Sequence, residues 1–241
     1  MRTAGWTDSV SVLDRVTAVF DAFGDDDALG VSELARRANL PKSTVSRIAA
    51  DLVEQRLLDR DGDKLSLGVR LFEFGQTVEQ PRLLRRHALP VMAELRNQTG
   101  LAVHLGVRDG SDVVIVAALR APGAAAPPSR VGSRRPAHVT ALGKALLAGS
   151  PPDPSDPPGL RHDLADVRRV GVAVQGDDCE IGTVGVAAAV LGYAGLVVAA
   201  LGVTASVDDS GSVEVLPQRS APAVRAAAHA IGRRLVAPRV P

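Results

Sequence analysis

The stretch Ala38–Leu58 reads ANLPKSTVSRIAADLVEQRLL and sets the expectations for the rest of the chain. Its apolar residues recur at the spacing of one helix face, and they are Val45, Ile48, Ala49, Leu52 and Val53. The opposite face carries only small or basic residues before Asp51, and they are Ser43, Ser46, Arg47 and Ala50. Such a face approaches a polyanion without repulsion. The pattern is typical of a helix that reads DNA, but an ordinary surface helix shares it, so the flanking segments decide.

The flanking segments complete a winged helix-turn-helix pattern. Residues 10–23 predict a first helix with a broad apolar face that includes Leu13. Ser32 is the expected N-cap of a short second helix, and Pro41 suits the first turn of the third. Two strand-like runs within residues 57–67 flank an Asp-Gly-Asp turn and predict a hairpin. A hairpin directly after a recognition helix is a wing.

Length and composition bound the class of protein. The 241 residues are enough for two domains of common size, and 46% of them are apolar. Six aromatic residues are too few for a platform that stacks single-stranded bases. No window reaches the roughly 20 apolar residues of a membrane span, and Met1–Val10 lacks the apolar core of a signal peptide. The single Cys179 forms no internal disulfide, so we expect a cytoplasmic protein without membrane contact.

The distribution of charge is more informative than the net charge of +1. Residues 1–80 carry 10 Lys and Arg against 14 Asp and Glu, a local net charge of −4, which excludes a uniformly basic domain. Within them, residues 34–50 contain no acid and four basic residues, which are Arg36, Arg37, Lys42 and Arg47. We therefore predict that positive charge concentrates on the segment quoted above, as a surface facing duplex DNA requires.

The remainder of the chain predicts connecting helices followed by a sheet. Residues 72–100 indicate helices that Gly75 and Pro81 break or kink. Runs rich in Val and Ala then predict an antiparallel sheet, with a hairpin at 101–117 and strands at 171–174, 185–190 and 196–203. Helices are expected at 140–148, at 160–169 and from Pro222 onward. Five prolines in residues 149–159 exclude regular structure there.

Two separate motif sets carry a family resemblance. The first is LPKSTVSRIAADLVEQRLL followed by LSLG. The second is VGSRRPAHVTALGKALLA at 131–148, with DVRRVGVAV, GTVGVAAAV and GLVVAALGV between Asp166 and Val203. In this order they resemble the IclR family of bacterial transcriptional regulators over residues 9–235. The resemblance implies an α+β protein with a winged helix-turn-helix domain at 1–70, a helical linker at 71–99 and a GAF-like antiparallel sheet domain at 100–238. The resemblance also implies that the last domain binds an effector and oligomerises.

The candidate DNA contacts lie on the third helix and the wing, and they are Lys42, Ser43, Thr44, Ser46, Arg47, Arg60 and Lys64. Arg47 is the expected specificity residue, because Arg pairs bidentately with guanine. Ser43 and Thr44 either hold a phosphate at the helix start or merely cap the helix. The family usually has Gly where this chain has Arg56, which implies a left-handed backbone or a different helix end at that position.

The resemblance also implies a pocket for small organic acids. It places seven residues there, which are Ala141, Leu142, Gln175, Thr183, Gly185, Gly202 and Thr204, and we add Arg135 to this set for its charge. Gln175 stands where the family often has an acidic residue, which removes a charge that repels carboxylates. Arg134 and Arg135 are candidate cationic partners for a carboxylate, with simple surface exposure as the alternative. The Pro-rich segment 149–159 is shorter than the segment that usually covers this pocket.

The resulting hypothesis is a ligand-responsive regulator that binds a pseudo-palindromic DNA operator as a homodimer or homotetramer. Its effector is expected to be a small carboxylic or aromatic acid. One alternative is a regulator whose C-terminal domain has lost effector binding and only oligomerises. Another is a small-molecule binding or catalytic protein with a vestigial winged domain. We expect no metal, cofactor or catalytic centre, because His104, His138, His162 and Cys179 lack ligand spacing and Cys179 has no cationic neighbour.

Overall fold

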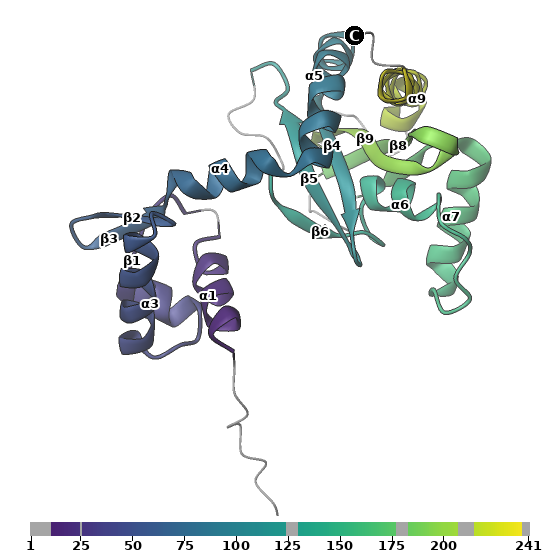
Figure 1. Ribbon diagram of the computed structural model, residues 1–241. Helices are drawn as coiled ribbons and strands as arrows, with labels where there is room; N and C mark the ends of the chain where they lie inside the picture. The colour runs from purple at the N-terminus through teal and green to yellow at the C-terminus, as the bar shows by residue number, and fades with distance from the viewer. Residues whose placement is uncertain (1–10, 25, 124–129, 177–182, 207–214, 238–241) are drawn as a thin grey trace, which may run out of the picture. The chain divides into compact units, whose positions relative to one another are not determined.

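The computed structural model describes residues 11–24, 26–123, 130–176, 183–206 and 215–237. The chain divides into two compact units, Met1–Glu79 and Gln80–Pro241, each with its own hydrophobic core (Figure 1). No helix in the described ranges is long and apolar enough to cross a membrane. The expected α+β class is confirmed, whereas the expectations for Met1–Val10 and Cys179 lie outside the described residues.

The N-terminal unit is a helix-turn-helix with a small sheet. Its helices are α1 (Val12–Asp21), α2 (Val31–Arg37), α3 (Lys42–Glu54) and α4 (Val69–Thr77), and its strands are β1 (Leu29–Gly30), β2 (Leu58–Asp61) and β3 (Lys64–Leu67). The strands form an antiparallel sheet in the order β1-β3-β2. The predicted wing is confirmed: β2 and β3 form a hairpin whose turn contains Gly62 at φ 59°.

The core of this unit forms where the apolar periodicity of α3 predicts it. Val45, Ile48, Ala49 and Leu52 are buried against residues of α1, α2 and the sheet. Two predicted helix starts are wrong. The N-cap of α2 is Gly30 rather than Ser32, and Pro41 precedes α3 as its N-cap. The pairing of β1 with β3 fixes Gly30 in extended backbone, so the helix begins at Val31, two residues before the start at Glu33 that an N-cap at Ser32 predicts.

The predicted breaks at Gly75 and Pro81 are wrong. Gly75 lies inside α4, and the interruption falls at Val78, the extended residue before α5 (Glu79–Thr99). Pro81 is the third residue of α5. It is tolerated because the first N–H groups of a helix have no intrahelical partner, so a missing one breaks no bond.

The C-terminal unit is built on a six-stranded antiparallel sheet in the order β6-β5-β4-β9-β8-β7. Its strands are β4 (Ala102–Asp109), β5 (Asp112–Leu119), β6 (Arg134–Pro136), β7 (Ala173–Gln175), β8 (Thr183–Leu191) and β9 (Val197–Ser206). Its helices are α5, α6 (Ala141–Leu147), α7 (Pro158–Val170) and α9 (Val215–Val236), with a short 3-10 turn η1 (Tyr193–Gly195). The predicted hairpin and the three further strands are confirmed.

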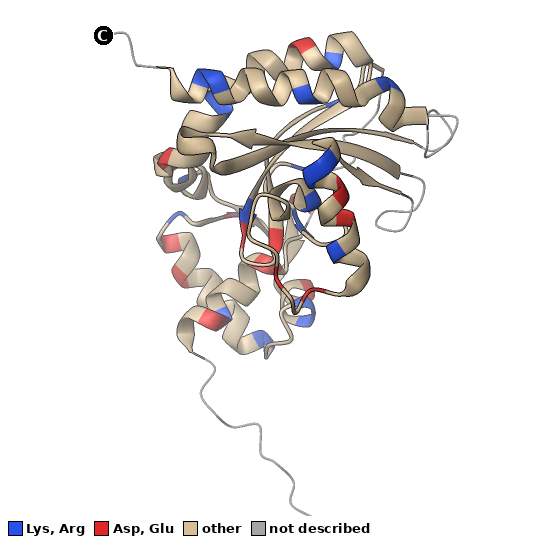
Figure 2. Ribbon diagram, turned by 90° about the vertical axis from the view of Figure 1, so that its right-hand side faces the viewer, with Lys and Arg blue, Asp and Glu red and all other residues tan. Residues whose placement is uncertain are grey.

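Helices cover both faces of this sheet, and the two faces differ in composition. One face, which includes Val103, Leu105, Leu201 and Val203, packs against α5 and α9. The other face packs against α6 and α7 and carries smaller residues such as Ala187 and Ala200. Figure 2 shows charged residues on the helices, and the strands β8 and β9 carry none. Small residues on the α6 face leave space beneath that helix.

Two expectations for the helices of this unit are corrected. α7 begins at Pro158, so the end of segment 149–159 is helical after all, because proline suits a first helical turn. α9 begins at Val215 and contains Pro222 inside it. An internal proline costs about 3 kcal/mol of helix stability. Burial of Leu216 before it and of Val224 after it offsets this cost.

Candidate functional sites

The helix α3 presents the predicted DNA-reading residues on one exposed face. Lys42, Ser43, Ser46 and Arg47 are exposed, and Thr44 is half-buried. Neither Ser43 nor Thr44 caps the helix, because the N-cap is Pro41 and no side chain bonds to the helix start. The first N–H groups of α3 therefore have no protein side chain as an acceptor and lie next to the exposed cations.

Only part of the predicted basic patch remains free. Arg36 and Arg37 both donate to Glu33 Oε1, at 2.5 Å from Arg36 Nη2 and 2.8 Å from Arg37 Nε, and Arg37 also pairs with Asp26. The hydrogen bonds of both guanidinium groups lower the pKa of Glu33 to about 2. Residues 34–50 contain no acid, but Glu33, one residue before this segment, pairs with two of its four basic residues. Within the described ranges, Lys42 and Arg47 form no ion pair, so the positive charge is concentrated on α3 itself.

The two predicted wing cations point to opposite faces of the hairpin. Arg60 pairs in register with the buried Leu65, whereas Lys64 pairs with Asp61 on the other face. Side chains alternate between the faces of a strand, so a single flat contact cannot engage both equally. Lys64 shares its face of the hairpin with its cross-strand partner Asp61. These positions favour Arg60 and Lys64 as separate contacts near the wing tip.

The junction between α3 and the wing adopts the left-handed backbone considered for Arg56, with φ 57°. Two neighbours support it. Arg70 Nη1 donates to the carbonyl oxygen of Gln55, the C-cap residue, at 2.6 Å. A Cβ on Gly68 would overlap the Arg56 carbonyl oxygen, so only glycine permits this close approach. Arg56 thus adopts the αL conformation although it carries a side chain.

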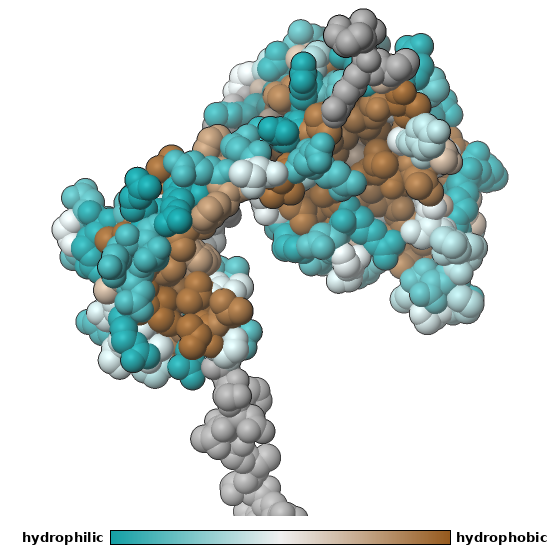
Figure 3. Space-filling view, in the orientation of Figure 1, coloured by the Kyte–Doolittle hydropathy of each residue, from teal (hydrophilic) through white to brown (hydrophobic). Residues whose placement is uncertain are grey.

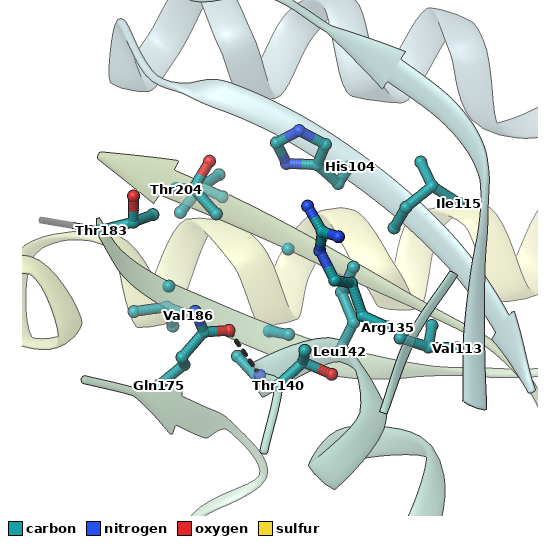
Figure 4. Close-up of a pocket in the computed structure, with 15 residues that line it drawn as sticks. His104, Val113, Ile115, Arg135, Thr140, Leu142, Gln175, Thr183, Val186 and Thr204 are labelled. Atoms are coloured by element: carbon teal, nitrogen blue, oxygen red, sulfur yellow. Dashed lines mark hydrogen bonds between the residues drawn. The ribbon is translucent and has the colours of Figure 1, made fainter. Parts of the chain in front are cut away.

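In the C-terminal unit, one cavity brings together all eight predicted effector residues (Figure 4). They come from β6, the start of α6, and strands β7, β8 and β9. The cavity lies between α6 and the sheet face that carries small residues. Its further lining residues include His104, Val113, Ile115 and Thr140.

The start of α6 is fixed from within this cavity. Thr140 Oγ1 accepts a hydrogen bond from Gly143 N at 3.0 Å and caps the helix. Gln175 Oε1 accepts from Ala141 N at 3.2 Å, which is the dashed line in Figure 4. Gln175 therefore accepts this hydrogen bond at the helix start without carrying a charge. An acidic residue at the same position would place a negative charge in a buried site.

The structure separates the two candidate arginines. Arg134 is exposed and pairs with Asp109 and Asp112 in the neighbouring hairpin. Because successive residues of a strand face opposite sides, Arg135 is directed to the other side, and its guanidinium points into the cavity (Figure 4). Of the two, only Arg135 is placed to meet a ligand there.

His104 lines this cavity although sequence reasoning considered it only as a metal ligand. It is 2% exposed on β4, and burial lowers its pKa to about 4. Its signal in the sequence is a single polar residue in the apolar run AVHLGV. Among the described residues, no group of three or more His, Cys, Asp and Glu is arranged to hold a metal ion.

Family models match both units. The IclR helix-turn-helix domain matches residues 12–62, and the bacterial transcriptional regulator IclR C-terminal domain matches residues 76–155 and 154–233. The chain belongs to the IclR family of bacterial transcriptional regulators. The resemblance drawn from the two motif sets is thereby confirmed.

Individual relatives agree with this family. KdgR of Dickeya chrysanthemi, an HTH-type transcriptional regulator, is 35% identical over 143 residues, which are 58% of this chain and 47% of KdgR. The alignment therefore spans about half of that relative. XynR of Escherichia coli, also an HTH-type transcriptional regulator, is 28% identical over 225 residues, 83% of this chain and 89% of XynR. These relatives are named as transcriptional regulators and not as enzymes.

A solved structure extends the likeness to the whole fold. The crystal structure of an IclR homolog from Microbacterium hydrocarbonoxydans, complexed with 4-hydroxybenzoate, is similar with a TM-score of 0.81 and 28% sequence identity. The match covers 93% of this chain and 99% of that chain.

Proposed function

We propose that this IclR-family regulator changes its affinity for a DNA operator when a small organic acid binds in the cavity beneath α6. The observation that carries the proposal is the convergence of eight residues, separated by up to 69 positions in sequence, on that one cavity. We also propose that the chain has three parts, a DNA-binding domain at 1–70, a helical linker at 71–99 and an effector-binding domain at 100–238. The linker at 71–99 then couples ligand binding to DNA binding.

The DNA-binding part of the proposal rests on α3. Arg47 reads a base edge in the major groove, while Lys42, Ser43, Thr44 and Ser46 contact phosphates or neighbouring bases. Arg60 and Lys64 add phosphate contacts near the wing tip. Exposure of α3 and the free charges of Lys42 and Arg47 support this assignment.

Selection of bound sequences from a random duplex library tests the DNA-binding part. We expect enrichment of a pseudo-palindrome whose half-sites lie about one helical turn apart, or a multiple of it, since two α3 helices of a dimer enter successive major grooves. Enrichment of no sequence, with binding that salt abolishes uniformly, would contradict base reading by α3.

A second copy of the chain is the proposed partner for the apolar surface of the N-terminal unit. Figure 3 shows an apolar patch over α1. Val12 and Leu13 are 69% and 75% exposed, and Phe72 on α4 is 64% exposed. Exposed apolar clusters of this kind mark protein contacts. Light scattering of the full chain should give the mass of a dimer or tetramer, and Leu13→Asp should lower it, whereas a monomeric wild type would refute this part.

The effector part of the proposal rests on Arg135 and the uncharged Gln175. A guanidinium directed into a mostly apolar cavity can bind a carboxylate bidentately. The IclR homolog of known structure binds 4-hydroxybenzoate, an aromatic acid. We therefore propose a small carboxylic or aromatic acid as the effector.

A thermal-shift panel of such acids, followed by titration of the operator complex, tests the effector part. At least one acid should raise the melting temperature and change operator affinity. Gly185→Ala is the matched variant, because its added Cβ would meet Thr204, Ala141 and Gln175 at 3.5–3.7 Å, so it fills cavity space without a clash. It should fold normally and lose the response. Absence of stabilisation by every acid would favour the alternative in which the C-terminal domain only oligomerises.

A further inference from the structure

The wall of the effector cavity contains two polar side-chain atoms without a hydrogen-bond partner among the described residues. They are His104 Nε2 and Thr204 Oγ1, and both are buried. Thr204 pairs with Ala102, two residues before His104 on β4, so the two side chains are diagonal neighbours on the same sheet face. One small ligand can contact both.

Such atoms are expensive to bury unless something pairs with them. Residues on either side of His104, Val103 and Leu105, are fully buried and apolar, so an apolar side chain would suit this strand better. The cross-strand neighbours of His104 are Gly202 and Ala118, and neither side chain offers a hydrogen bond. The neighbouring strands therefore supply no partner for the imidazole, and a ligand in the cavity that His104 and Thr204 both line can supply one.

The chemistry of the two atoms restricts that partner. Burial keeps the imidazole neutral at pH 7, with its pKa lowered to about 4, so it does not act as a second cation for the ligand's carboxylate. A neutral imidazole nitrogen either donates or accepts, and a threonine hydroxyl does both. A hydroxyl group on the ligand also does both, so it satisfies the pair whichever ring nitrogen carries the proton. A hydrocarbon group in the same place leaves both atoms unpaired.

We propose that the effector is a hydroxy acid, whose acid group binds Arg135 and whose separate hydroxyl group binds His104 Nε2 and Thr204 Oγ1. In Figure 4 the guanidinium of Arg135 lies beside the imidazole, with Thr204 on the adjoining strand, so the two groups of one small molecule reach these partners together. This inference rests on the proposed effector site and adds the second group that the ligand must carry.

Matched pairs of acids that differ by one hydroxyl test the inference on the full-length chain. The pairs are the three hydroxybenzoate isomers against benzoate, and lactate and 3-hydroxypropionate against propionate, with affinity measured by calorimetry. At least one hydroxy acid should bind tenfold or more tightly than its deoxy partner, since a site built for a hydroxyl rejects ligands without one.

Variants locate the discrimination. Thr204→Val keeps the side-chain shape and removes the hydroxyl, and His104→Leu removes the imidazole. Each should lower the ratio of affinities, and together they should bring it to within about threefold, mainly by weakening the hydroxy acid. His229→Leu, a histidine on α9 outside the cavity, should leave the ratio unchanged.

The outcomes separate this inference from the proposal beneath it. Equal affinities within every pair, or a ratio that survives both substitutions, would overturn hydroxyl recognition while effector binding stands. Failure of every acid to bind the wild-type chain would overturn both. Because Thr204→Val alone is a near-isosteric change, it keeps the test decisive if His104→Leu does not fold.

Discussion

The two candidate sites differ in how the chain builds them. The DNA-reading face takes five residues from the short stretch 42–47 of one helix, whose other side, which includes Val45, is core. The effector cavity takes residues from all six strands of the sheet and from the start of α6, between His104 and Thr204. The first site therefore needs only one correctly packed helix, while the second needs the whole sheet in register and α6 packed against it. Substitutions should damage the two sites in different ways.

The two sites also differ in the free-energy cost of their polar groups. Lys42 and Arg47 keep their charges in water, where an unpaired cation costs little. His104 and Thr204 hold polar atoms away from water with no described partner. The DNA-reading face can thus be altered without loss of fold, whereas the cavity ties recognition to stability.

The largest expected effect comes from Gly143→Ala in α6. An added Cβ would overlap the backbone of Ala137, including its carbonyl oxygen, and backbone cannot move aside cheaply. We expect a loss of roughly 3 kcal/mol in the stability of the C-terminal unit, at the upper end for overpacked sites. Chemical denaturation of the full chain measures it.

A glycine of the N-terminal unit supplies the control. Gly75 lies inside α4 with nothing within 4 Å of an added Cβ. Gly75→Ala should therefore stabilise its helix by up to about 1 kcal/mol, the usual propensity difference. If both substitutions stabilise the protein, α6 does not pack closely against the backbone of Ala137, and the contrast between the two units is wrong.

Arg47→Ala is expected to weaken the operator complex by about 1–3 kcal/mol and to relax base preference at one position. The fold should not change, because Arg47 is exposed and unpaired among the described residues. Binding titrations at several salt concentrations measure the effect. Arg161→Ala removes the same charge from α7 and should leave base preference intact. Equal losses for both variants would reduce Arg47 to a general electrostatic role.

Stability should fall as the pH is lowered from 7 to 5, by about 2 kcal/mol from His104 alone. Its pKa is 6.5 in the unfolded chain and is lowered to about 4 by burial, so the unfolded state binds the extra proton in this window. The contribution is complete above pH 6.5 and is lost progressively toward pH 4. Denaturation at each pH measures it, and His104→Leu should flatten the dependence. An unchanged slope in that variant would show that His104 is not buried neutral.

Sequence reasoning succeeded where a pattern is local. The periodicity of Val45, Ile48, Ala49 and Leu52 predicted both the core side and the exposed side of α3, because a helix repeats at fixed spacing. It failed where partners lie outside the chosen window. Glu33 neutralises Arg36 and Arg37, and β1 moves the start of α2.

The cavity shows the same limit. Seven of its eight predicted residues followed from family resemblance and Arg135 from its charge, since no spacing in the sequence places Arg135 in the same cavity as Thr204. The choice between Arg134 and Arg135 required the register of β6 against Val113 and Val114. His104 was visible only as a polar residue in an apolar run, and its unpaired Nε2 emerges from three-dimensional neighbours alone.

The smallest predicted effect concerns Arg56, where a side chain occupies a left-handed backbone at φ 57°. Glycine adopts this conformation without the Cβ clash, which costs other residues roughly 1–2 kcal/mol, but it loses more chain entropy on folding. Arg56→Gly should therefore stabilise the N-terminal unit by about 0.5–1 kcal/mol net. Arg56→Ala is the matched variant, because it removes the same charge and keeps the Cβ, so it should not stabilise.

Denaturation and operator binding of these two variants should be measured together. If strain at the junction has no role in DNA reading, Arg56→Gly raises stability and leaves operator affinity equal to that of Arg56→Ala. Because α3 and the wing both leave this junction, a change in affinity seen only with glycine would mean that the strained backbone sets the angle between them. The DNA-reading face would then depend on more than one helix, and the contrast with the cavity would narrow.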